Sequence, residues 1–441
     1  MRPRVPLRRR VSAARASSGA LTALAISSLA GAVAGADALK VVLPPWSSVA
    51  LSPDVRSVRV PRGEQTIAFG PSREAARRGT ASEGALLPLF GAAVGPGCKS
   101  TWLHVGPEAW LCADEAQLTQ ASPLTATEGA PSFEDGLPFR YFFAGEGGAR
   151  AYRRLVDFDV EEPAFELERG FAVAIVAEQV LRGERYGYTR RGLWVRMSEF
   201  GPARPTTFVG ERLDVADGSA ELPFAWVHHD RAPTFRRVGP AFVATGDTLA
   251  RLDRVGWYGE ERVLGTTYAR IDEQRWIRAA DVRHPTLASA PSEVDVARSE
   301  RWIDVELATQ SLVAYEGPRP VYATLVSTGR GKPGSALATP VGAHRIWVKL
   351  LSATMDNLEE PDAAHYYRIE DVPHVQFFAK GVGLHAAFWH RSFGHTRSHG
   401  CVNLAPRDAA WLFRFSGPHL PAGWAAALPT RFDRGTVVRV R

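Results

Sequence analysis

The chain has 441 residues, carries 53 lysine and arginine side chains against 47 acidic ones, and contains three cysteines. This length predicts several compact domains. Six arginines and no acidic residue fall within residues 1–36, so these residues account for the whole net charge of +6. The rest of the chain lacks the basic excess expected of a nucleic-acid-binding protein, and we expect no nucleic-acid partner.

Residues 1–36 have the order of a secretory signal peptide. A run of arginines is followed by 13 mostly apolar residues, 21–33, and then by small residues at Ala34 and Ala36. An uncleaved membrane anchor is the alternative, but this apolar run is short for a bilayer span and contains serine and glycine. We therefore expect an exported protein, in the periplasm or cell wall, with no membrane span after cleavage.

Cys98 and Cys112 lie at the ends of two short apolar runs joined at Gly106 and Pro107. This pattern predicts a hairpin whose ends a disulfide can bridge. Export to an oxidising compartment favours that disulfide over two buried thiols. Cys401 is then an unpaired thiol in an exported protein, which calls for an explanation.

Two stretches rich in Ser, Thr, Pro and Gly, residues 121–138 and 284–293, predict joints between compact units. Such joints expose backbone with few contacts. Proteolysis is therefore expected to cut at both and to leave a folded fragment of about 298–441.

A loose repeat runs through the chain before residue 284. It reads WLCADE from Trp110, WVRMSE from Trp194 and WIRAAD from Trp276. Recurring short strands with turn signals favour small all-β units. We assign these units to residues 41–121, 138–215 and, as a possible third, 216–284. They resemble bacterial SH3-like modules, in which a late strand begins with tryptophan. The resemblance implies binding of cell-wall peptides, with spacing and scaffolding as the alternative.

The last unit, residues 298–441, predicts a β-rich domain with few helices. Ile303 and Val305 alternate with acidic residues, as in a half-buried strand, and residues 311–326 predict a hairpin. Residues 339–350 predict a turn and another strand. Pro406 begins a short segment with helical spacing of apolar residues. The chain is thus expected to be mainly β, and its sequence has no Gly-rich loop of the P-loop or dinucleotide kind.

Four histidines precede the unpaired thiol of Cys401: His385, His390, His395 and His399. A zinc site is disfavoured, because the sequence has no CxxC or HExxH and the spacings match no helical face. A nucleophilic cysteine fits better, since a neighbouring histidine can take the thiol proton and return it to a leaving amine. An inert buried cysteine is the alternative.

The residues around Cys401 favour the nucleophile. Gly400 lets backbone approach a substrate, so that nearby amides can receive an oxyanion. Ser398 and Asn403 are short polar residues that could orient these parts.

The segment 385–404, HAAFWHRSFGHTRSHGCVNL, resembles the signature of the L,D-transpeptidase catalytic domain, the YkuD family. The match is a histidine, a variable stretch and then Ser-His-Gly-Cys, an apolar residue and Asn. Residues 338–346 resemble the family's Thr-Pro-x-Gly turn, and residues 323–329 the strand before it. The similarity covers most of residues 300–420.

The resemblance implies Cys401 as the acyl-accepting thiolate and His385 as its proton acceptor and donor, with His390 as the competing base. His399 and Gly400, with the Cys401 amide, would form the oxyanion site. Asn403 stands where many members have arginine. The residue after His385 is alanine, so the orienting partner of the imidazole is expected elsewhere, for example at a backbone carbonyl.

Residues 351–373 are polar, acidic and without clear periodicity, which predicts a long loop. In the family, a flap over the acyl-donor path often occupies this position. Met355 and Tyr367, with Tyr366, are then the side chains that would lie on a substrate. An ordinary surface loop is the alternative.

The expected function is therefore that of a peptidoglycan L,D-transpeptidase. It would form 3→3 cross-links between peptide stems through a cysteine thioester, without metal or organic cofactor, and would be acylated by carbapenems. Water or a protein amine as acceptor would make it an L,D-carboxypeptidase or a protein-attachment enzyme. A non-catalytic wall-binding protein is the remaining alternative. A papain-like protease is disfavoured, since its cysteine precedes its histidine.

The thiols provide a direct test of these assignments. In the unreduced protein, Cys401 should react with iodoacetamide while Cys98 and Cys112 do not, and reduction should make all three reactive. Peptide mass spectrometry after alkylation measures this. A disulfide that includes Cys401 would remove the basis for calling it the nucleophile.

Overall fold

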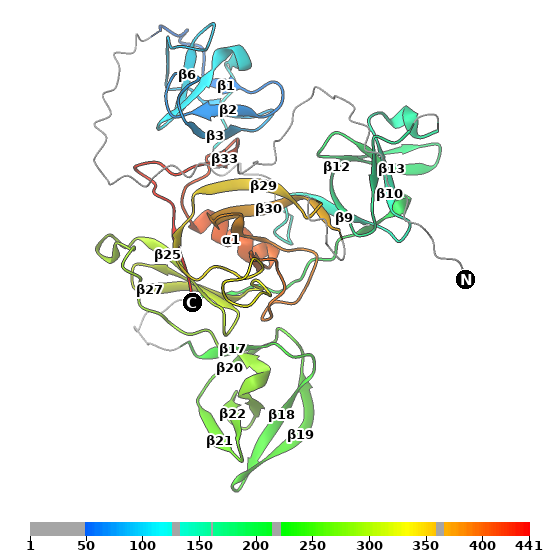
Figure 1. Cartoon of the computed structure of the whole chain (residues 1–441), viewed down its shortest axis with the longest axis vertical. Helices are drawn as coiled ribbons and strands as arrows, with labels where there is room; N and C mark the ends of the chain where they lie inside the picture. Colours follow the sequence, from blue (N-terminus) through cyan, green and yellow to red (C-terminus); the bar gives the residue numbers. More distant parts are fainter. Residues whose placement is uncertain (1–48, 126–132, 160–161, 214–221, 359–365) are drawn as a thin grey trace.

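The computed structural model describes residues 49–125, 133–159, 162–213, 222–358 and 366–441 (Figure 1). The expected signal peptide lies outside these residues. The described chain is mainly β, as predicted, and has one α-helix, α1 (Pro406–Phe415). None of its helices is long and apolar enough to cross a membrane.

Three groups of strands surround the C-terminal domain instead of forming a line with it (Figure 1). The first group comprises β1 (Ser57–Arg59), β2 (Gln65–Ala68), β3 (Arg77–Ala81), β4 (Leu86–Pro88), β5 (Gly91–Ala93), β6 (Trp102–Gly106), β7 (Ala109–Cys112) and β8 (Gln117–Thr119). The second comprises β9 (Arg140–Ala144), β10 (Ala149–Tyr152), β11 (Phe165–Leu167), β12 (Ala172–Leu181), β13 (Glu184–Thr189), β14 (Trp194–Arg196) and β15 (Phe200–Pro202). The third comprises β17 (Phe224–Val227), β18 (Ala232–Val238), β19 (Ala241–Leu249), β20 (Arg254–Gly256), β21 (Glu260–Val263), β22 (Thr266–Arg270), β23 (Trp276–Arg278) and β24 (Val282–Arg283).

The repeat seen in the sequence is one structural unit that occurs three times. Each copy is a strand that begins at or one residue before the tryptophan, a 3₁₀ turn, and another short strand. The turns are η1 (Ala113–Glu115), η3 (Met197–Glu199) and η4 (Ala279–Asp281). In each copy the first backbone N–H after the turn bonds to the carbonyl of its first residue. The acidic residue of the repeat is the last residue of the turn.

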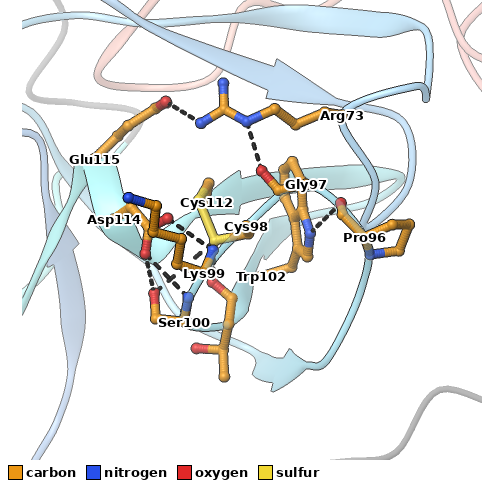
Figure 2. Close-up of a disulfide and its surroundings, with 11 residues drawn as sticks. Arg73, Pro96, Gly97, Cys98, Lys99, Ser100, Trp102, Cys112, Asp114 and Glu115 are labelled. Atoms are coloured by element: carbon orange, nitrogen blue, oxygen red, sulfur yellow. Dashed lines mark hydrogen bonds and ion pairs between the residues drawn. A yellow bond between two sulfur atoms is a disulfide. The ribbon is translucent and has the colours of Figure 1, made fainter.

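Cys98 and Cys112 form a disulfide in the first group, with Cα atoms 5.7 Å apart (Figure 2). β6 and β7 pair antiparallel, as the predicted hairpin requires. The Asp114 carboxylate accepts the backbone N–H groups of Lys99 and Ser100, at 2.8 and 3.0 Å. Together with the Ser100 hydroxyl, these bonds hold the pKa of Asp114 below its usual value.

The C-terminal domain has two sheets with α1 between them. One sheet has the order β16-β27-β26-β25-β34-β28. Its strands are β16 (Glu211–Arg212), β25 (Arg301–Glu306), β26 (Ser311–Glu316), β27 (Arg319–Leu325), β28 (Gly342–Arg345) and β34 (Val437–Val440). The other contains β29 (Val348–Asp356), β30 (Arg368–Ala379), β31 (Val382–Ala386), β32 (Val402–Leu404) and β33 (Trp424–Ala427). Ala409, Leu412 and Phe415, on one face of α1, pack into the core between the sheets.

The prediction of a half-buried strand at residue 303 was wrong, because β25 is buried on both faces. Asp304 is 1% exposed and its carboxylate accepts Arg439 at 2.6 Å and Arg441 at 2.9 Å. Alternation of apolar and charged residues thus arose here from buried ion pairs and not from solvent.

The stretch 284–293 is not a free joint. The backbone N–H of Ala288 donates to the Tyr315 hydroxyl at 2.9 Å, and Arg439 donates to the Ser289 carbonyl at 2.7 Å. Arg345 donates to the Glu293 carbonyl at 2.6 Å. These bonds hold the segment along the sheet that contains β25.

Within 351–373, residues 351–356 and 368–373 are strand, so the prediction of a long loop was wrong for these parts; residues 359–365 lie outside the described residues. β29 and β30 pair antiparallel from Val348↔Phe377 to Asp356↔Arg368. Glu370 and Asp371, which made the segment look solvated, are buried. Asp371 faces Arg190 and Arg191, which are distant in sequence, whereas Glu370 pairs with Arg368 two residues away. Local periodicity does not report the distant partners of Asp371.

A second core joins the C-terminal domain to the preceding chain. Phe208, Phe224 and Trp226 cover the face of β25–β27 that carries Trp302 and Tyr315. Helix α1 is tied to the same segment, because Asp408 accepts the Gly210 N–H at 2.9 Å. A fragment that begins at residue 298 loses all of these partners.

We expect residues 204–441 to fold cooperatively. The shorter fragment, residues 298–441, should be far less stable, and too unstable to survive as the folded product of proteolysis. Exposing Trp302, Tyr315 and Phe393 costs about 1.5–3 kcal/mol each, and a whole domain is stable by about 5–15 kcal/mol. Urea unfolding of both fragments, followed by near-UV circular dichroism, measures the difference. Equal unfolding midpoints would contradict it.

Candidate active site

The parallel pairing of β31 with β32 fixes where Cys401 and His385 lie relative to each other. His385 lies opposite Asn403 in this register. Cys401 comes one residue before β32. Continuing the register by one position places it beside Gly383, where the paired strands begin. Because side chains alternate between faces, Cys401 and His385 emerge on the same face of the sheet.

The Cys401 thiol is half-buried and rests against the backbone that leads into β31. The thiol lies 3.9 Å from the carbonyl oxygen of Gly381, and the Gly383 amide also hydrogen-bonds to the sulfur. Burial raises the pKa of the thiol, while the Gly383 amide, by stabilising the thiolate, works in the opposite direction. The balance favours a neutral thiol at pH 7.

His385 is buried and oriented by backbone. Its Nδ1–H donates to the carbonyl of the adjacent Ala386 at 3.1 Å, which leaves the lone pair on Nε2. The Trp389 ring stacks beside it, with centroids 5.8 Å apart. Burial lowers the pKa of His385 to about 4, so the imidazole is neutral at pH 7 and able to accept a proton. Within the described part of the chain, Nε2 of His385 has no hydrogen-bond partner.

His390 is engaged at both ring nitrogens. Its Nδ1 accepts the Ser392 N–H at 3.1 Å, so its proton lies on Nε2, 2.9 Å from the side-chain amide of Asn403. Because the Nε2–H of His390 needs an acceptor, the Asn403 amide must present its oxygen to His390. Burial lowers the pKa of His390 to about 3. His390 therefore positions Asn403 and has no nitrogen left for the thiol.

The other two histidines of the motif serve different contacts. His395 lies at the interface with the third group, where Nε2 donates to the His228 carbonyl at 2.9 Å. His399 accepts a hydrogen bond from Arg330 at Nε2, at 2.7 Å, which requires a neutral ring with its proton on Nδ1.

The turn before Cys401 is shaped by side chains that hold its backbone. Ser398 is buried; its hydroxyl donates to the Cys401 carbonyl and accepts the Gly400 N–H at 3.1 Å. Thr339 donates to the Gly400 carbonyl at 2.7 Å and accepts the Gly329 N–H at 2.9 Å. Gly400 has φ +127°, a conformation that favours glycine. In this structure, Ser398 and Gly400 therefore shape the turn.

Tyr367 lies beside this turn, whereas Met355 does not. The Tyr367 ring stacks on His399 with centroids 5.8 Å apart. Its backbone N–H donates to the Asn357 side chain at 2.8 Å. Met355 pairs with Ile369 and packs against an apolar cluster between β30 and the second group.

Sequence reasoning missed three residues of the site. Thr339 was noted only as part of a turn, and its bond to Gly400 needs the fold to be seen. Gly383 acts through its amide, which no side-chain pattern reports. Arg330 reaches His399 from a loop 69 residues earlier.

A metal site was not expected from the sequence, and the histidines of the motif lie in separate networks. Among the described residues, the one cluster of three metal-ligating side chains is Cys98, Cys112 and Asp114. Both of its sulfurs are already joined in the disulfide.

Residues 300–440 match the family model of YkuD, the L,D-transpeptidase catalytic domain. No curated protein shows significant similarity to the chain. The match agrees with the site, since the Cys401 turn, β31 and β32 all lie within it. The family assignment concerns this domain, about a third of the chain.

Several solved L,D-transpeptidases are similar to parts of the chain. A mutant of the Enterococcus faecium enzyme is 23% identical, over 32% of this chain and 50% of that one, with a TM-score of 0.24. The catalytic domain of the E. faecium enzyme acylated by ertapenem is 23% identical, over 32% and 98%, with a TM-score of 0.24. The Mycobacterium smegmatis enzyme is 16% identical, over 61% and 99%, with a TM-score of 0.25. The chain thus spans about half the length of the first of these.

The neutral state of both groups predicts the pH dependence of Cys401 alkylation. Because the thiolate is the reacting form and burial raises the thiol pKa, the rate with iodoacetamide should rise about tenfold per pH unit from pH 6 to 8. Since the pKa of His385 is about 4, its titration should add no inflection in that range. Mass spectrometry of the adduct gives the rate, with glutathione as control. A plateau above pH 6 would instead indicate a preformed thiolate–imidazolium pair.

Proposed function

We propose that the protein is a peptidoglycan L,D-transpeptidase that forms 3→3 cross-links. The observation that carries this proposal is the parallel register of β31 and β32, from which Cys401 and His385 extend on the same side, together with the Ala386 bond that leaves the His385 lone pair on Nε2. The match of residues 300–440 to the L,D-transpeptidase catalytic domain supports it.

In the acylation step, the Cys401 sulfur attacks the carbonyl carbon of the diamino acid at position three of a tetrapeptide stem. Nε2 of His385 takes the thiol proton as the carbon–sulfur bond forms. The tetrahedral intermediate then expels the terminal D-alanine, whose nitrogen receives that proton from His385. The product is a thioester on Cys401 and free D-alanine.

In the second step, the side-chain amine of another stem attacks the thioester carbonyl. His385 accepts a proton from this amine, the carbon–sulfur bond breaks, and the proton passes to the departing thiolate. The thiol and a neutral imidazole are restored, so no redox partner, metal or organic cofactor takes part. Water or a protein amine in place of the stem would give hydrolysis or protein attachment.

The oxyanion formed in both steps needs donors near the Cys401 sulfur. The Cys401 amide and the His399 residue remain our candidates. The Gly400 amide is a weaker one, because it already donates to Ser398. Tyr367 would contact the donor stem beside His399, and Asn403 is held nearby by His390.

We further propose that the protein is exported to the periplasm or cell wall and that carbapenems acylate Cys401. The three groups of strands before residue 284 would act as SH3-like modules. Each group contacts the C-terminal domain, the first through β3 and β33, the second through β12 and β30, and the third through a shared core, which supports a structural role.

Incubation with disaccharide-tetrapeptide, followed by mass spectrometry, tests the proposal. Wild type should yield cross-linked dimer, and Cys401→Ala none. His385→Ala should lose about 10²–10⁴ in rate, the usual contribution of a positioned acid–base. His390→Ala should lose less in rate, with a lower Tm, because it removes only the support of Asn403.

Carbapenem labelling provides an independent reading of the same site. Wild type should gain one drug equivalent at Cys401, and His385→Ala should label far more slowly. Tripeptide monomer alone would indicate a carboxypeptidase. Neither adduct nor peptide processing would favour the non-catalytic wall-binding alternative. Normal labelling of His385→Ala, with loss in His390→Ala, would reassign the base.

A further inference from the structure

Two arginines of the second group reach the antiparallel pair β29–β30. Arg190 and Arg191 follow β13, and both face Asp371 near the start of β30. Nη1 of Arg190 lies 3.6 Å from Oδ1 of Asp371, and Nη2 of Arg191 lies 3.4 Å from the same atom. Asp371 is 1% exposed, so this contact is a buried charge cluster.

Asp371 depends on these partners. Its Oδ1 also accepts the Ser352 hydroxyl at 3.1 Å, while Oδ2 is buried with no partner among the described residues. A buried carboxylate without opposite charge is strongly unfavourable. Asp371 also has φ +51°, an uncommon conformation for a residue other than glycine. The surrounding contacts, more than local preference, therefore hold this part of β30.

The second group also contacts β29 and β30 at other residues. The Tyr141 hydroxyl donates to the Asp371 carbonyl at 2.6 Å, and Arg191 donates to the Thr354 hydroxyl of β29 at 2.7 Å. Ala172 of β12 pairs with Ile369 of β30. Both strands of the pair are thus held from outside the C-terminal domain.

The held portion of β30 leads directly to the candidate site. Tyr367 precedes Asp371 by four residues, and its ring stacks on His399, two residues before Cys401. The opposite end of β30 pairs with β31, at Gln376↔Leu384. The nucleophile is held by different contacts, namely those of Ser398 and Thr339. A shift of β30 near Asp371 would therefore move Tyr367 more than Cys401.

We propose that Asp371, clasped by Arg190 and Arg191, is a positioning residue through which the second group of strands sets the affinity of the site for its acyl-donor peptide. These two arginine–Asp371 contacts, called the clasp below, keep Tyr367 against His399. This inference rests on the proposed function, since the donor is the tetrapeptide stem.

The test compares full-length variants. Arg190→Gln combined with Arg191→Gln should raise the KM for disaccharide-tetrapeptide about tenfold while kcat changes little, the pattern of indirect coupling to binding. Asp371→Asn should behave similarly, and Arg191→Lys should keep most of the affinity. The rate of Cys401 alkylation by iodoacetamide should stay unchanged, because this small reagent makes no use of Tyr367.

Arg185→Gln is the matched control. It breaks an exposed ion pair with Glu178 in the same group of strands, at 3.6 Å. Since this pair is formed between β12 and β13, its loss should leave KM unaltered. A control variant that raises KM as much as the arginine pair would overturn the proposal.

A double-mutant cycle separates positioning from mere stability. In a Tyr367→Ala background, the arginine substitutions should no longer change KM, because the residue through which they act is gone. Full additivity, or a fall in Tm with unchanged KM, would show that the clasp only joins two domains. A parallel loss of iodoacetamide reactivity would show collapse of the whole site, which also overturns the proposal.

Hydrogen exchange gives a readout independent of activity. Backbone amides of residues 366–371 should exchange faster in the arginine variants than in Arg185→Gln. If wild type processes no tetrapeptide, the proposed function fails and the donor-affinity claim falls with it. Faster exchange would then still establish the clasp, and unchanged exchange would exclude it.

Discussion

The parallel pairing of β31 with β32 is the contact on which the candidate site depends. Neither strand holds both reacting groups, and fifteen residues lie between His385 and Cys401 in the sequence. The pairing shortens that separation to neighbouring positions on two strands. The turn before Cys401 must then end in a fixed conformation. Ser398, Gly400 and Thr339 supply it through hydrogen bonds to backbone that a change of register would break.

Burial sets the chemistry of this pair. It raises the pKa of the thiol and lowers that of the imidazole, so both groups are neutral at pH 7. Proton transfer from sulfur to Nε2 therefore belongs to the reaction itself. The Ala386 carbonyl orients the imidazole and partly stabilises its protonated form, in the place where other enzymes use a carboxylate.

The C-terminal domain does not depend on its own residues alone for stability, because the preceding groups of strands contribute contacts to it. Phe208 and Trp226 complete a core of the C-terminal domain, and the third group bonds to the chain just before Cys401 through His228. Arg190 and Arg191 of the second group hold β30. The second and third groups of strands thus contribute to the support of the candidate site, whether or not they also bind the cell wall.

The sequence by itself determined the mainly β class, the hairpin at Cys98 and Cys112, and the start of α1 at Pro406, because turn residues and local periodicity encode such features. It also singled out Cys401 and His385 by motif. Only the tertiary structure distinguished the ring nitrogens of His385 and His390. It also decided that Asp304 is buried and that residues 351–356 and 368–373 are strand. These outcomes depend on partners distant in sequence, such as Arg439 and Arg191, and a charged residue carries no local sign of whether water or a buried opposite charge will face it.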